Sequence, residues 1–391
     1  MEKMMDLRYV VIGSHTDKRP QLYKEGITSK SGNEWAAAGV GRVEIEHHSW
    51  CDFVRGDVLT TMKPGEERVI VRLFSPWAEE MTYSMAVDRG AEVLSSQGRM
   101  PKRIRMDHRD ALLLNSIIAT EGMKGIILDT GRIIEAMYPG AHRINPIPYV
   151  LSATDKKIES DMLQENGIAH PFTVTDAGSA EEVIELLRGS TRTDTLYIKP
   201  RGGSSGELIS ILRLRGGAPV LKTGLREVDG SYVVDKQLKE VTEPKAIEDT
   251  INLLLDLGVV VQEGVAKVSE GGKNFDIRMH VINMGVPYHY FRMSETEITN
   301  ISGGGTGKFD PGAGFGGIPA EVIERGRALS QRIAEHYQVF DFGSDIICTP
   351  DFRNVYVLET NAFPSCFDGA HQVFDVYRHE VETTLRRITR S

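Results

Sequence analysis

Short apolar runs alternate with helix-like segments through the first 150 residues. The runs RYVVIG (8–13), ERVIVRLF (67–74) and KGIILD (124–129) have the length and composition of buried strands. Between the last two, WAEEMTYSMAVDRGAEVLSS (77–96) spaces its apolar residues as one face of a helix. This alternation predicts an α/β layer with a largely parallel sheet. PGAHRINPIPYV (139–150), rich in proline and turn residues, predicts that a first domain ends at residue 150.

The rest of the chain combines helical and extended patterns. The helical patterns cover residues 155–167, 179–189, 242–258 and 320–337. Ser179 with Glu182 forms a capping-box pattern, and Thr242 is the predicted cap of the next helix. The expected strands are TLYIKP (195–200), GELISILRLR (206–215), SYVVDKQL (231–238), VVVQEGV (259–265), FDIRMHVI (275–282), FGSDIICTP (342–350) and VYVLETNAF (355–363).

Composition narrows the class of protein. The chain has 391 residues, 40% of them hydrophobic, and a formal net charge of −9, which argues against general nucleic-acid binding. Three cysteines without a CxxC pair suit reduced thiols, and no signal peptide or long apolar segment is visible. We therefore expect a cytoplasmic protein without a membrane span. The basic stretch 99–115 is interpreted as a solvated face, with an acidic substrate as its alternative partner.

The stretch YIKPRGGSSGELI (197–209) places Lys199 ahead of a glycine- and serine-rich run. A Walker A loop has its lysine after the glycines, and a dinucleotide loop needs G-x-G-x-x-G before a helix, so neither motif is present. A strand pattern follows the loop, which predicts the tip of an antiparallel hairpin. Its backbone N–H groups and serines can cover phosphates, because glycine lets the backbone approach closely. The alternative is a hairpin tip without a ligand.

Three oxygen-bearing side chains occur in the last two predicted strands. Glu359 and Asn361 are two residues apart and therefore share one sheet face. A turn at residues 351–354 brings Asp345 opposite them. Two carboxylates and an amide oxygen suit Mg²⁺, which also binds substrate phosphates. The alternative is a solvated polar face on an edge hairpin.

Two further segments bear on the same site. In FDIRMHVI, Asp276 and Arg278 are two apart, and an arginine beside a metal site can neutralise a transferring phosphoryl group. A surface ion pair is the alternative. NISGGGTGKFDPGAGFGG (300–317) is too long and glycine-rich for a tight turn, so a functional lid is expected. Cys348 and Cys366 receive no role, since buried cysteines usually act as small hydrophobes.

Taken in order, these pieces resemble the ATP-grasp superfamily over about 210 residues. The motifs that carry the resemblance are TDKKIESDMLQENGIAHPFTV, YIKPRGGSSGE, VVVQEGV, FDIRMHV, TNISGGG and FGSDIICT…VYVLETNAFPS. The tail is most similar to the ribosomal-protein-glutamate-ligase-like branch and to spore-coat-associated ATP-grasp proteins. The resemblance implies an α/β (α+β) ATP-grasp fold. Its expected parts are a pre-ATP-grasp domain (1–150), a lid subdomain with a linker helix (151–262) and a C-terminal metal-binding subdomain (263–391).

The resemblance also implies roles for individual residues. For ATP, the implied contacts are Lys156 (or its neighbour Lys157), Lys199, the flexible loop Gly202, Gly203, Ser204, Ser205 and Gly206, and the hinge residues Gln262, Glu263 and Val265. Glu270 is the candidate for the ribose. Arg278 and Asn300 are implied at the reaction centre, and Asp345, Glu359 and Asn361 as ligands of two Mg²⁺ ions, with Mn²⁺ as an alternative.

The function implied is an ATP-dependent carboxylate–amine ligase. A carboxylate takes the γ-phosphate of ATP to give an acyl phosphate, and an amine then displaces phosphate. The expected partners are small substrates such as an amino acid, a peptide or a natural-product intermediate, with a homodimer left open. Two alternatives remain: ligation to a thiol or carrier protein or phosphoryl transfer, and a non-catalytic ATP-binding protein of the spore-coat type.

Overall fold

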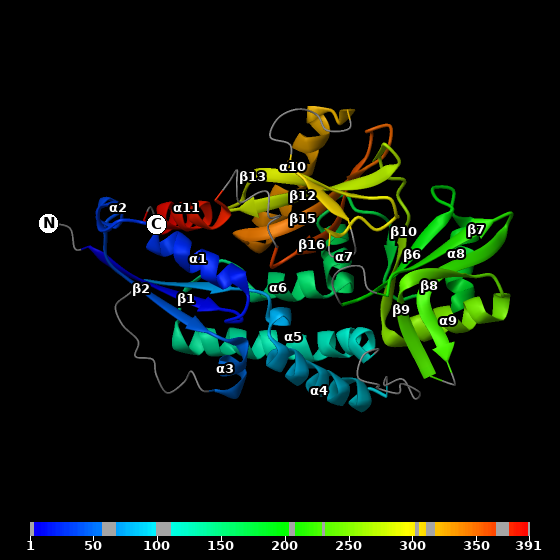
Figure 1. Ribbon diagram of the computed structural model, residues 1–391, viewed down its shortest axis with the longest axis horizontal. Coiled ribbons are helices and arrows are strands. Elements are labelled where there is room, and N and C mark those ends of the chain that lie inside the picture. The colour runs from blue at the N-terminus through cyan, green and yellow to red at the C-terminus, as the bar shows by residue number, and fades with distance from the viewer. Residues whose placement is uncertain are drawn as a thin grey trace.

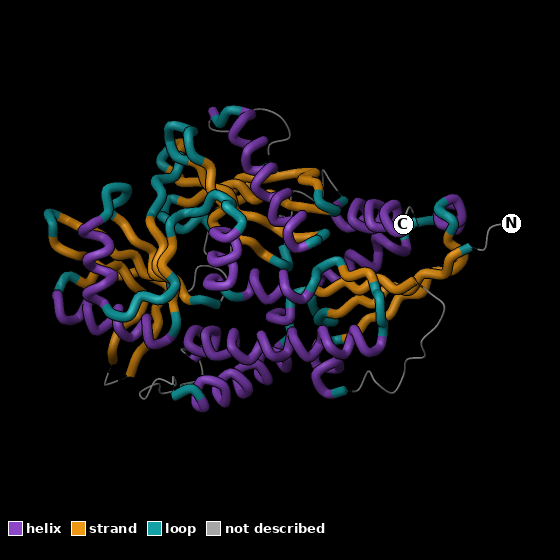
Figure 2. The backbone as a smooth tube through the Cα atoms, turned by 180° about the vertical axis from the view of Figure 1, so that it is seen from behind, coloured by secondary structure: helices purple, strands orange, loops and turns teal. Residues whose placement is uncertain are grey.

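Three β-sheets follow one another along the chain and form its frame (Figure 1). The computed structural model describes residues 4–56, 68–98, 111–202, 208–228, 231–301, 305–309, 317–364 and 375–389. Figure 2 shows the same frame from behind, with two long helices, α4 and α5, along its base. Within these described ranges, no helix is long and apolar enough to cross a membrane.

The first sheet is parallel, as the alternating pattern predicts. Its strands are β1 (Met5–Ile12), β2 (Val40–His48), β3 (Arg68–Leu73) and β4 (His142–Arg143), in the order β2-β1-β3-β4. The helices of this region are α1 (Lys18–Thr28), α2 (Gly32–Ala37), α3 (Trp50–Arg55), the 3₁₀ helix η2 (Pro76–Ala78), α4 (Glu80–Ser96) and α5 (Ala111–Met137). The central strands β1 and β3 contribute side chains to a core cluster on each face of the sheet, which explains the apolar runs within them.

One predicted strand of this region is wrong. KGIILD (124–129) lies inside α5, a helix of 27 residues. Its buried residues Met123, Ile126, Ile127 and Ile134 follow helical spacing and join the largest core cluster. A short apolar run does not distinguish a buried strand from part of a buried helix, and here the longer pattern decides.

Helices α4 and α5 touch at two glycines. A Cβ on Gly90 would lie 1.8 Å from the carbonyl oxygen of Ile118, and one on Gly122 would lie 1.9 Å from that of Ala86. No real Cβ approaches a backbone oxygen so closely, so an alanine at either position must push the two helices apart. The glycines therefore set the distance between α4 and α5.

Gly122→Ala is expected to lower the free energy of unfolding by about 1–3 kcal/mol, as overpacking in a core does. Gly189→Ala is the matched control, because the last residue of α8 has open space around its Cβ position. Urea unfolding of both variants measures the difference. Equal stability of the two variants would show that the close approach of α4 and α5 is not a constraint.

The second sheet is antiparallel. Its strands are β5 (Thr173–Val174), β6 (Thr195–Pro200), β7 (Ser210–Arg215), β8 (Ala218–Val228), β9 (Ser231–Val241) and β10 (Val259–Glu263), in the order β5-β10-β6-β7-β8-β9. Helices α8 (Ala180–Gly189) and α9 (Pro244–Leu257) share an apolar cluster with it. The pairing of β6 with β7 confirms the predicted hairpin around the glycine-rich loop.

The caps of these two helices differ in detail from the sequence pattern. The hydroxyl of Ser179 accepts from the backbone N–H of Glu182, but the Glu182 carboxylate accepts from Gly178, so only half of the capping box forms. Helix α9 is capped by Glu243 instead of Thr242, since its carboxylate accepts from two backbone N–H groups of the first turn. Which of two adjacent residues caps a helix depends on whether its side-chain oxygen can approach the first backbone N–H groups, and the sequence pattern alone does not show this.

The third sheet carries the two predicted carboxylate strands. It contains β11 (Ser269–Glu270), β12 (Lys273–Ile282), β13 (Gly285–Ser294), β14 (Thr306–Lys308), β15 (Asp341–Cys348) and β16 (Val355–Asn361). The order is β14-β13-β12-β15-β16, with β11 paired to β12, and all pairs are antiparallel. The remaining helices are α6 (Ile147–Thr154), α7 (Lys156–Glu165), α10 (Ala320–Tyr337) and α11 (Val376–Ile388).

The first and third sheets share one apolar core, whereas the second has its own. The largest cluster joins Val10 and Val71 of the first sheet to Ile277, Phe342 and Val357 of the third. Helix α11 returns to the first sheet and packs beside α1 (Figure 1). The domain boundaries expected at residues 150 and 262 stay predictions.

Candidate functional site

Lys199 lies on the face of β6 that looks away from helices α8 and α9. Leu196 and Ile198 point into the apolar cluster with these helices, so Tyr197 and Lys199 point to the opposite side. Lys199 is buried, and its ammonium donates to Oε1 of Gln262 on β10 at 2.6 Å. Burial lowers the pKa of Lys199 to about 8, and the Lys156 charge contributes to the lowering. The structure thus brings two predicted nucleotide residues into contact.

Lys156 and Lys157 point in different directions from the first turn of α7. Nζ of Lys156 lies 4.0 Å from Oε2 of Glu359. Nζ of Lys157 instead donates to Asp176 at 2.6 Å. Asp155, which caps the helix, is fully buried and accepts from Arg201. Of the two lysines, Lys156 is the one beside the carboxylate strand.

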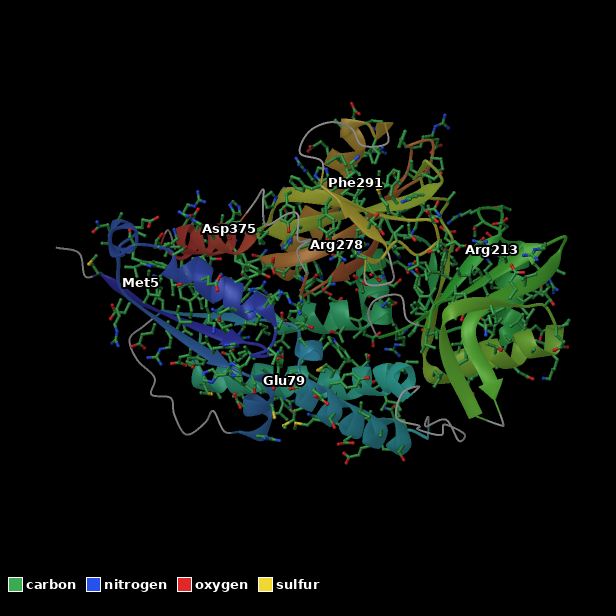
Figure 3. The ribbon with its side chains drawn as sticks, in the orientation of Figure 1. Met5, Glu79, Arg213, Arg278, Phe291 and Asp375 are labelled. Atoms are coloured by element: carbon green, nitrogen blue, oxygen red, sulfur yellow. The ribbon has the colours of Figure 1, made fainter. Side chains whose placement is uncertain are left out.

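Asp345 and Glu359 are cross-strand partners, as the predicted hairpin requires. Asp345 is buried and paired with two arginines: Arg278 from β12 binds both of its oxygens, and Nη2 of Arg292 from β13 lies 2.6 Å from Oδ2. Burial alone raises the pKa of Asp345, but the two guanidinium groups outweigh it and lower this pKa to about 2. Figure 3 shows Arg278 near the middle of the molecule, among the strands of the third sheet.

Asp276 is not paired with Arg278, its neighbour in the FDIR motif. It accepts two hydrogen bonds from Arg292, at 2.7 and 2.9 Å, and both residues are buried. The alternative of a surface ion pair is therefore excluded for this strand. Sequence analysis missed Arg292, although an arginine inside the apolar strand YHYFRM is the same signal that singled out Arg278.

The donor atoms around Glu359 suit a hard divalent cation in part. Glu359 is about one-third exposed, and its carboxylate borders the pocket. Oδ1 of Asn361 accepts from the backbone N–H of Phe363, which leaves a second lone pair. Both oxygens of Asp345, by contrast, already accept from arginines. Glu359 and Asn361 thus keep oxygen acceptors that suit Mg²⁺, whereas both oxygens of Asp345 are occupied by Arg278 and Arg292.

The described ranges contain no group of three or more His, Cys, Asp or Glu side chains that could hold a metal ion. The predicted set has only two carboxylates, so phosphate oxygens and water must complete any coordination shell.

A pocket lies between the second and third sheets, where the predicted hinge residues meet the carboxylate strand. Its apolar walls are Tyr197, Ile209, Ile347 and Leu358. The polar lining is Lys199, Gln262, Glu263, Lys267, Glu297, Thr299, Asn300 and Glu359, with Val265 beside the hinge. Apolar side chains together with a few polar groups are the lining that a planar heteroaromatic ring requires.

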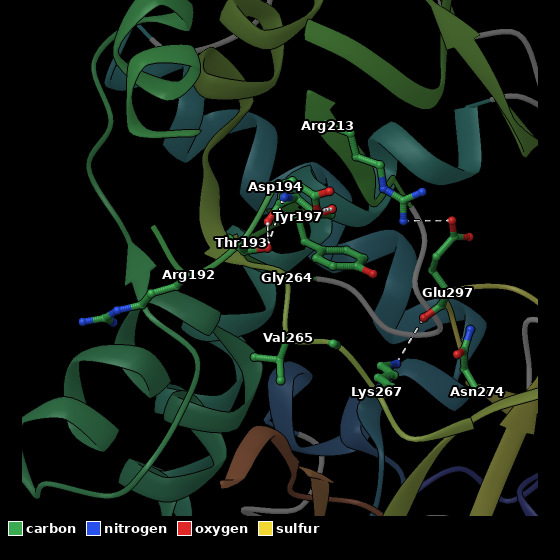
Figure 4. A pocket seen from close by; sticks show the side chains of 12 residues that line it. Arg192, Thr193, Asp194, Tyr197, Arg213, Gly264, Val265, Lys267, Asn274 and Glu297 are labelled. Atoms are coloured by element: carbon green, nitrogen blue, oxygen red, sulfur yellow. Dashed lines mark hydrogen bonds and ion pairs between the residues drawn. The ribbon is translucent and has the colours of Figure 1, made fainter. Parts of the chain in front are cut away.

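A second pocket of about 450 Å³ adjoins the first through Tyr197, Val265, Lys267 and Glu297 (Figure 4). Figure 4 shows Glu297 turned toward Arg213 of the second sheet, at 3.0 Å. Nζ of Lys267 donates to the carbonyl oxygen of Glu297 at 3.1 Å. This bridge links the segments before β11 and after β13 to β7 of the second sheet. It could not be predicted from the sequence, because its members lie far apart in the chain.

The glycine-rich loop begins against helix α5. A Cβ on Gly202 would lie 2.0 Å from Oγ1 of Thr120, so only glycine fits there. Gly203, Ser204, Ser205 and Gly206 lie outside the described residues, as do Cys366 and the side chain of Glu270. Much of the second glycine-rich stretch is likewise outside, but residues 306–308 form β14. Cys348 is buried, as expected.

Comparison with known proteins adds the family. A model of the family described as YheC/D-like ATP-grasp matches residues 171–387, which is more than half of the chain. The chain belongs to this family. The predicted ATP-grasp superfamily and fold are thereby confirmed. No curated protein matches the sequence of this ATP-grasp protein.

Solved ATP-grasp ligases share the fold along nearly the whole chain. PsnB, complexed with its minimal precursor, Mg and ADP, is 17% identical over 98% of each chain, with a TM-score of 0.52. The D-cycloserine synthetase DcsG is 14% identical over 97% of this chain and 99% of its own, with a TM-score of 0.53. The macrocyclase MdnC from Microcystis aeruginosa MRC, bound with the precursor peptide MdnA, is 12% identical over 98% and 100%, with a TM-score of 0.52.

Proposed function

We propose that the protein is an ATP-dependent ligase that joins a carboxylate to an amine and releases ADP and phosphate. The observation that carries the proposal is that Lys199 lines two pockets, one together with Lys156 and the other together with Glu359. Nζ of Lys156 lies 4.0 Å from Oε2 of Glu359, which brings the three side chains to one place. Two lysine ammonium groups and a carboxylate beside a partly apolar pocket suit a nucleoside triphosphate with a bound metal ion. Membership of the ATP-grasp family supports the same chemistry.

In this proposal the adenine occupies the slot between Tyr197 and Leu358. The hinge residues Gln262, Glu263 and Val265 border its edge, and Lys199 and Lys156 bind the phosphates. Gly202, Gly203, Ser204, Ser205 and Gly206 remain the proposed phosphate-contacting residues, and of these the structure describes Gly202. Both lysines are positioned to neutralise charge that develops as the γ-phosphoryl group leaves.

Mg²⁺ is the proposed counterion, held by Glu359, Asn361 and Asp345. Bound there, Mg²⁺ would supply positive charge that offsets the negative charge of the phosphates. Arg278 and Arg292 face the same carboxylate, Asp345. One of these guanidinium groups can turn to the acyl phosphate while the other keeps Asp345 charged. Asn300 lines the same pocket and is proposed to orient the reacting carboxylate.

A specific observation favours a second candidate, a protein that binds ATP without turnover. Both carboxylate oxygens of Asp345 contact arginines, so this residue has no oxygen left to bind a metal ion in this arrangement. Turnover with any pair of substrates excludes this candidate. Measured binding of Mg·ATP without turnover supports it.

The decisive experiment measures ADP and phosphate release from Mg·ATP with pools of amino acids, small carboxylic acids and peptides. Peptides are included because PsnB and MdnC are seen with precursor peptides. A product mass equal to acid plus amine less water establishes the ligase. Hydroxylamine trapping then tests the acyl phosphate, and a hydroxamate is the expected product. ADP release that depends on a thiol or a carrier protein would overturn the carboxylate–amine assignment.

Lys199→Met is expected to weaken ATP binding about 10- to 100-fold, since a charge-assisted hydrogen bond in a buried site contributes about 1.5–3 kcal/mol. The ammonium form predominates at pH 7 and is lost as pH rises through about 8. The affinity of the free protein for ATP should therefore fall across that range, and the Lys199→Met variant should lose this step. Calorimetry between pH 6.5 and 9 measures both, with the exposed-surface variant Lys245→Met as control. An unchanged pH profile in Lys199→Met would contradict the phosphate role.

A further inference from the structure

The end of β16 after Glu359, and the bend that follows it, are hydrogen-bonded by side chains from outside the third sheet. The backbone N–H of Thr360 donates to the carboxylate of Glu159 on α7. The carbonyl oxygen of Ala362 accepts from Nδ2 of Asn145 at 3.0 Å, just before α6. Two side chains from the first 165 residues thus bind the backbone on either side of Asn361.

A third side chain extends this contact. Nη1 of Arg19, in the first turn of α1, donates to the carbonyl oxygen of Phe363 at 3.1 Å. The three donors and acceptors come from α1, α7 and the segment between β4 and α6. We call Arg19, Asn145 and Glu159 the turn clamp.

The position of β16 explains why the clamp is needed. In the described part of the third sheet, β16 ends the strand order. Its outer backbone groups have no strand partner and must be satisfied by other means. Near its start, Val357 donates to the carbonyl oxygen of Ala169 at 2.8 Å. At its end, the turn clamp supplies the partners.

Two members of the clamp are rigidly supported. Glu159 is only 4% exposed, and Asn145 is fully buried. Asn145 also donates to the carbonyl oxygen of Asp341 at 2.7 Å and accepts from Arg72, a buried arginine of β3. Asn145 therefore ties the first sheet to the end of β16. A backbone held at residues 360, 362 and 363 leaves the side chains of Glu359 and Asn361 little freedom to change direction.

We infer that Arg19, Asn145 and Glu159 are positioning residues that hold Glu359 and Asn361 in the orientation that binds a divalent cation with the nucleotide. This inference rests on the proposed function. Outer groups that orient metal ligands typically change metal affinity about 10- to 100-fold when they are removed. Through the turn clamp, residues from the first 165 positions fix the backbone of residues 360–363, next to the proposed metal ligands.

The opposite end of the same hairpin offers a matched control. Arg325 on α10 donates to the carbonyl oxygens of Phe352 and Arg353 in the β15–β16 turn. Like the clamp, it holds hairpin backbone from outside the sheet, but at the end away from Asn361. Its loss should affect stability without affecting metal affinity.

The test measures Mn²⁺ binding to the full chain in the presence of ADP, by electron paramagnetic resonance, alongside urea unfolding. Glu159→Ala is expected to raise the Mn²⁺ Kd about tenfold or more. Glu159→Gln keeps an acceptor oxygen for Thr360 and should stay within about threefold of the wild type. Arg325→Ala should bind Mn²⁺ as the wild type does. If Glu159→Ala does not fold, Arg19→Ala replaces it, because Arg19 is less buried.

The outcomes separate the clamp from the proposed function. Wild-type protein that binds no Mn²⁺ with ADP overturns the metal site itself, and the clamp with it. Wild-type binding with an unchanged Kd in Glu159→Ala or Arg19→Ala overturns the clamp alone. An equal rise of the Mn²⁺ Kd in Glu159→Gln and Glu159→Ala would show that the negative charge of Glu159 matters, and not its hydrogen bond to the backbone of Thr360, which would contradict the positioning role. A loss in Arg325→Ala equal to that in the clamp variants would assign it to general stability.

Discussion

Glu359→Ala is expected to reduce Mg·ATP turnover by about a hundredfold or more while the fold stays intact. Loss of one preorganised electrostatic group at a phosphoryl-transfer site typically costs about 10²–10³ in rate. The cost in stability should be small, because Glu359 is partly exposed and lies 4.0 Å from Lys156, and such pairs contribute at most about 1 kcal/mol.

The measurement is ADP release with the substrates found by the pool screen, together with urea unfolding of the same variant. Glu324→Ala, on the exposed side of α10, is the control for removal of a glutamate from a surface ion pair. Turnover that persists in Glu359→Ala would remove the metal assignment of this strand, whatever the stability shows.

Asp345→Ala is expected to destabilise the protein by about 3–5 kcal/mol, the usual cost of leaving a buried charge without its partner. Two guanidinium groups depend on this one carboxylate, since Arg278 and Arg292 both contact it and both are buried. Asp276 still pairs with Arg292 in the variant, so Arg278 bears most of the loss.

Urea unfolding measures this effect, and Asp249→Ala on the exposed face of α9 is the control. The pH dependence has a definite sign. The pKa of Asp345 is lowered to about 2, so its contribution to stability is complete above the unfolded value near 3.8 and is lost as pH falls through about 2. A loss below about 1 kcal/mol in Asp345→Ala would show that the arginines do not rely on it.

Sequence reasoning succeeded where a local pattern specified the structure. The hairpin around Lys199 and the pairing of Asp345 with Glu359 followed from alternation within short strands and from turns of a few residues. The order of the motifs identified the superfamily, because that order reflects the succession of sheets along the chain. The one wrong strand, 124–129, failed because a run of six residues is too short to show a reliable period.

The rest of the site depends on contacts between distant parts of the chain. Arg292 meets Asp345 across two strand pairings, and Asn145 meets Ala362 across 217 residues. Glu159 received no role from its sequence pattern, yet it is buried and accepts from the backbone N–H of Thr360, and burial raises its pKa to about 7. Contacts between such residues cannot be predicted from one sequence while the order of the strands in the sheets is unknown. Nothing in the neighbouring sequence distinguishes these residues from polar residues that face solvent.

The return of α11 to the first sheet has a consequence for biosynthesis. Tyr23 and Ile27 of α1 share a core cluster with Val381, Leu385 and Ile388 of α11. On the ribosome, roughly 350 residues are added between these two helices, which takes roughly 20 to 70 s at about 5–20 residues per second. During that interval the residues of α1 in this cluster lack their partners from α11. The packing of α1, an early helix, is thus completed only after α11 has been translated, and chaperones have that time to act on it.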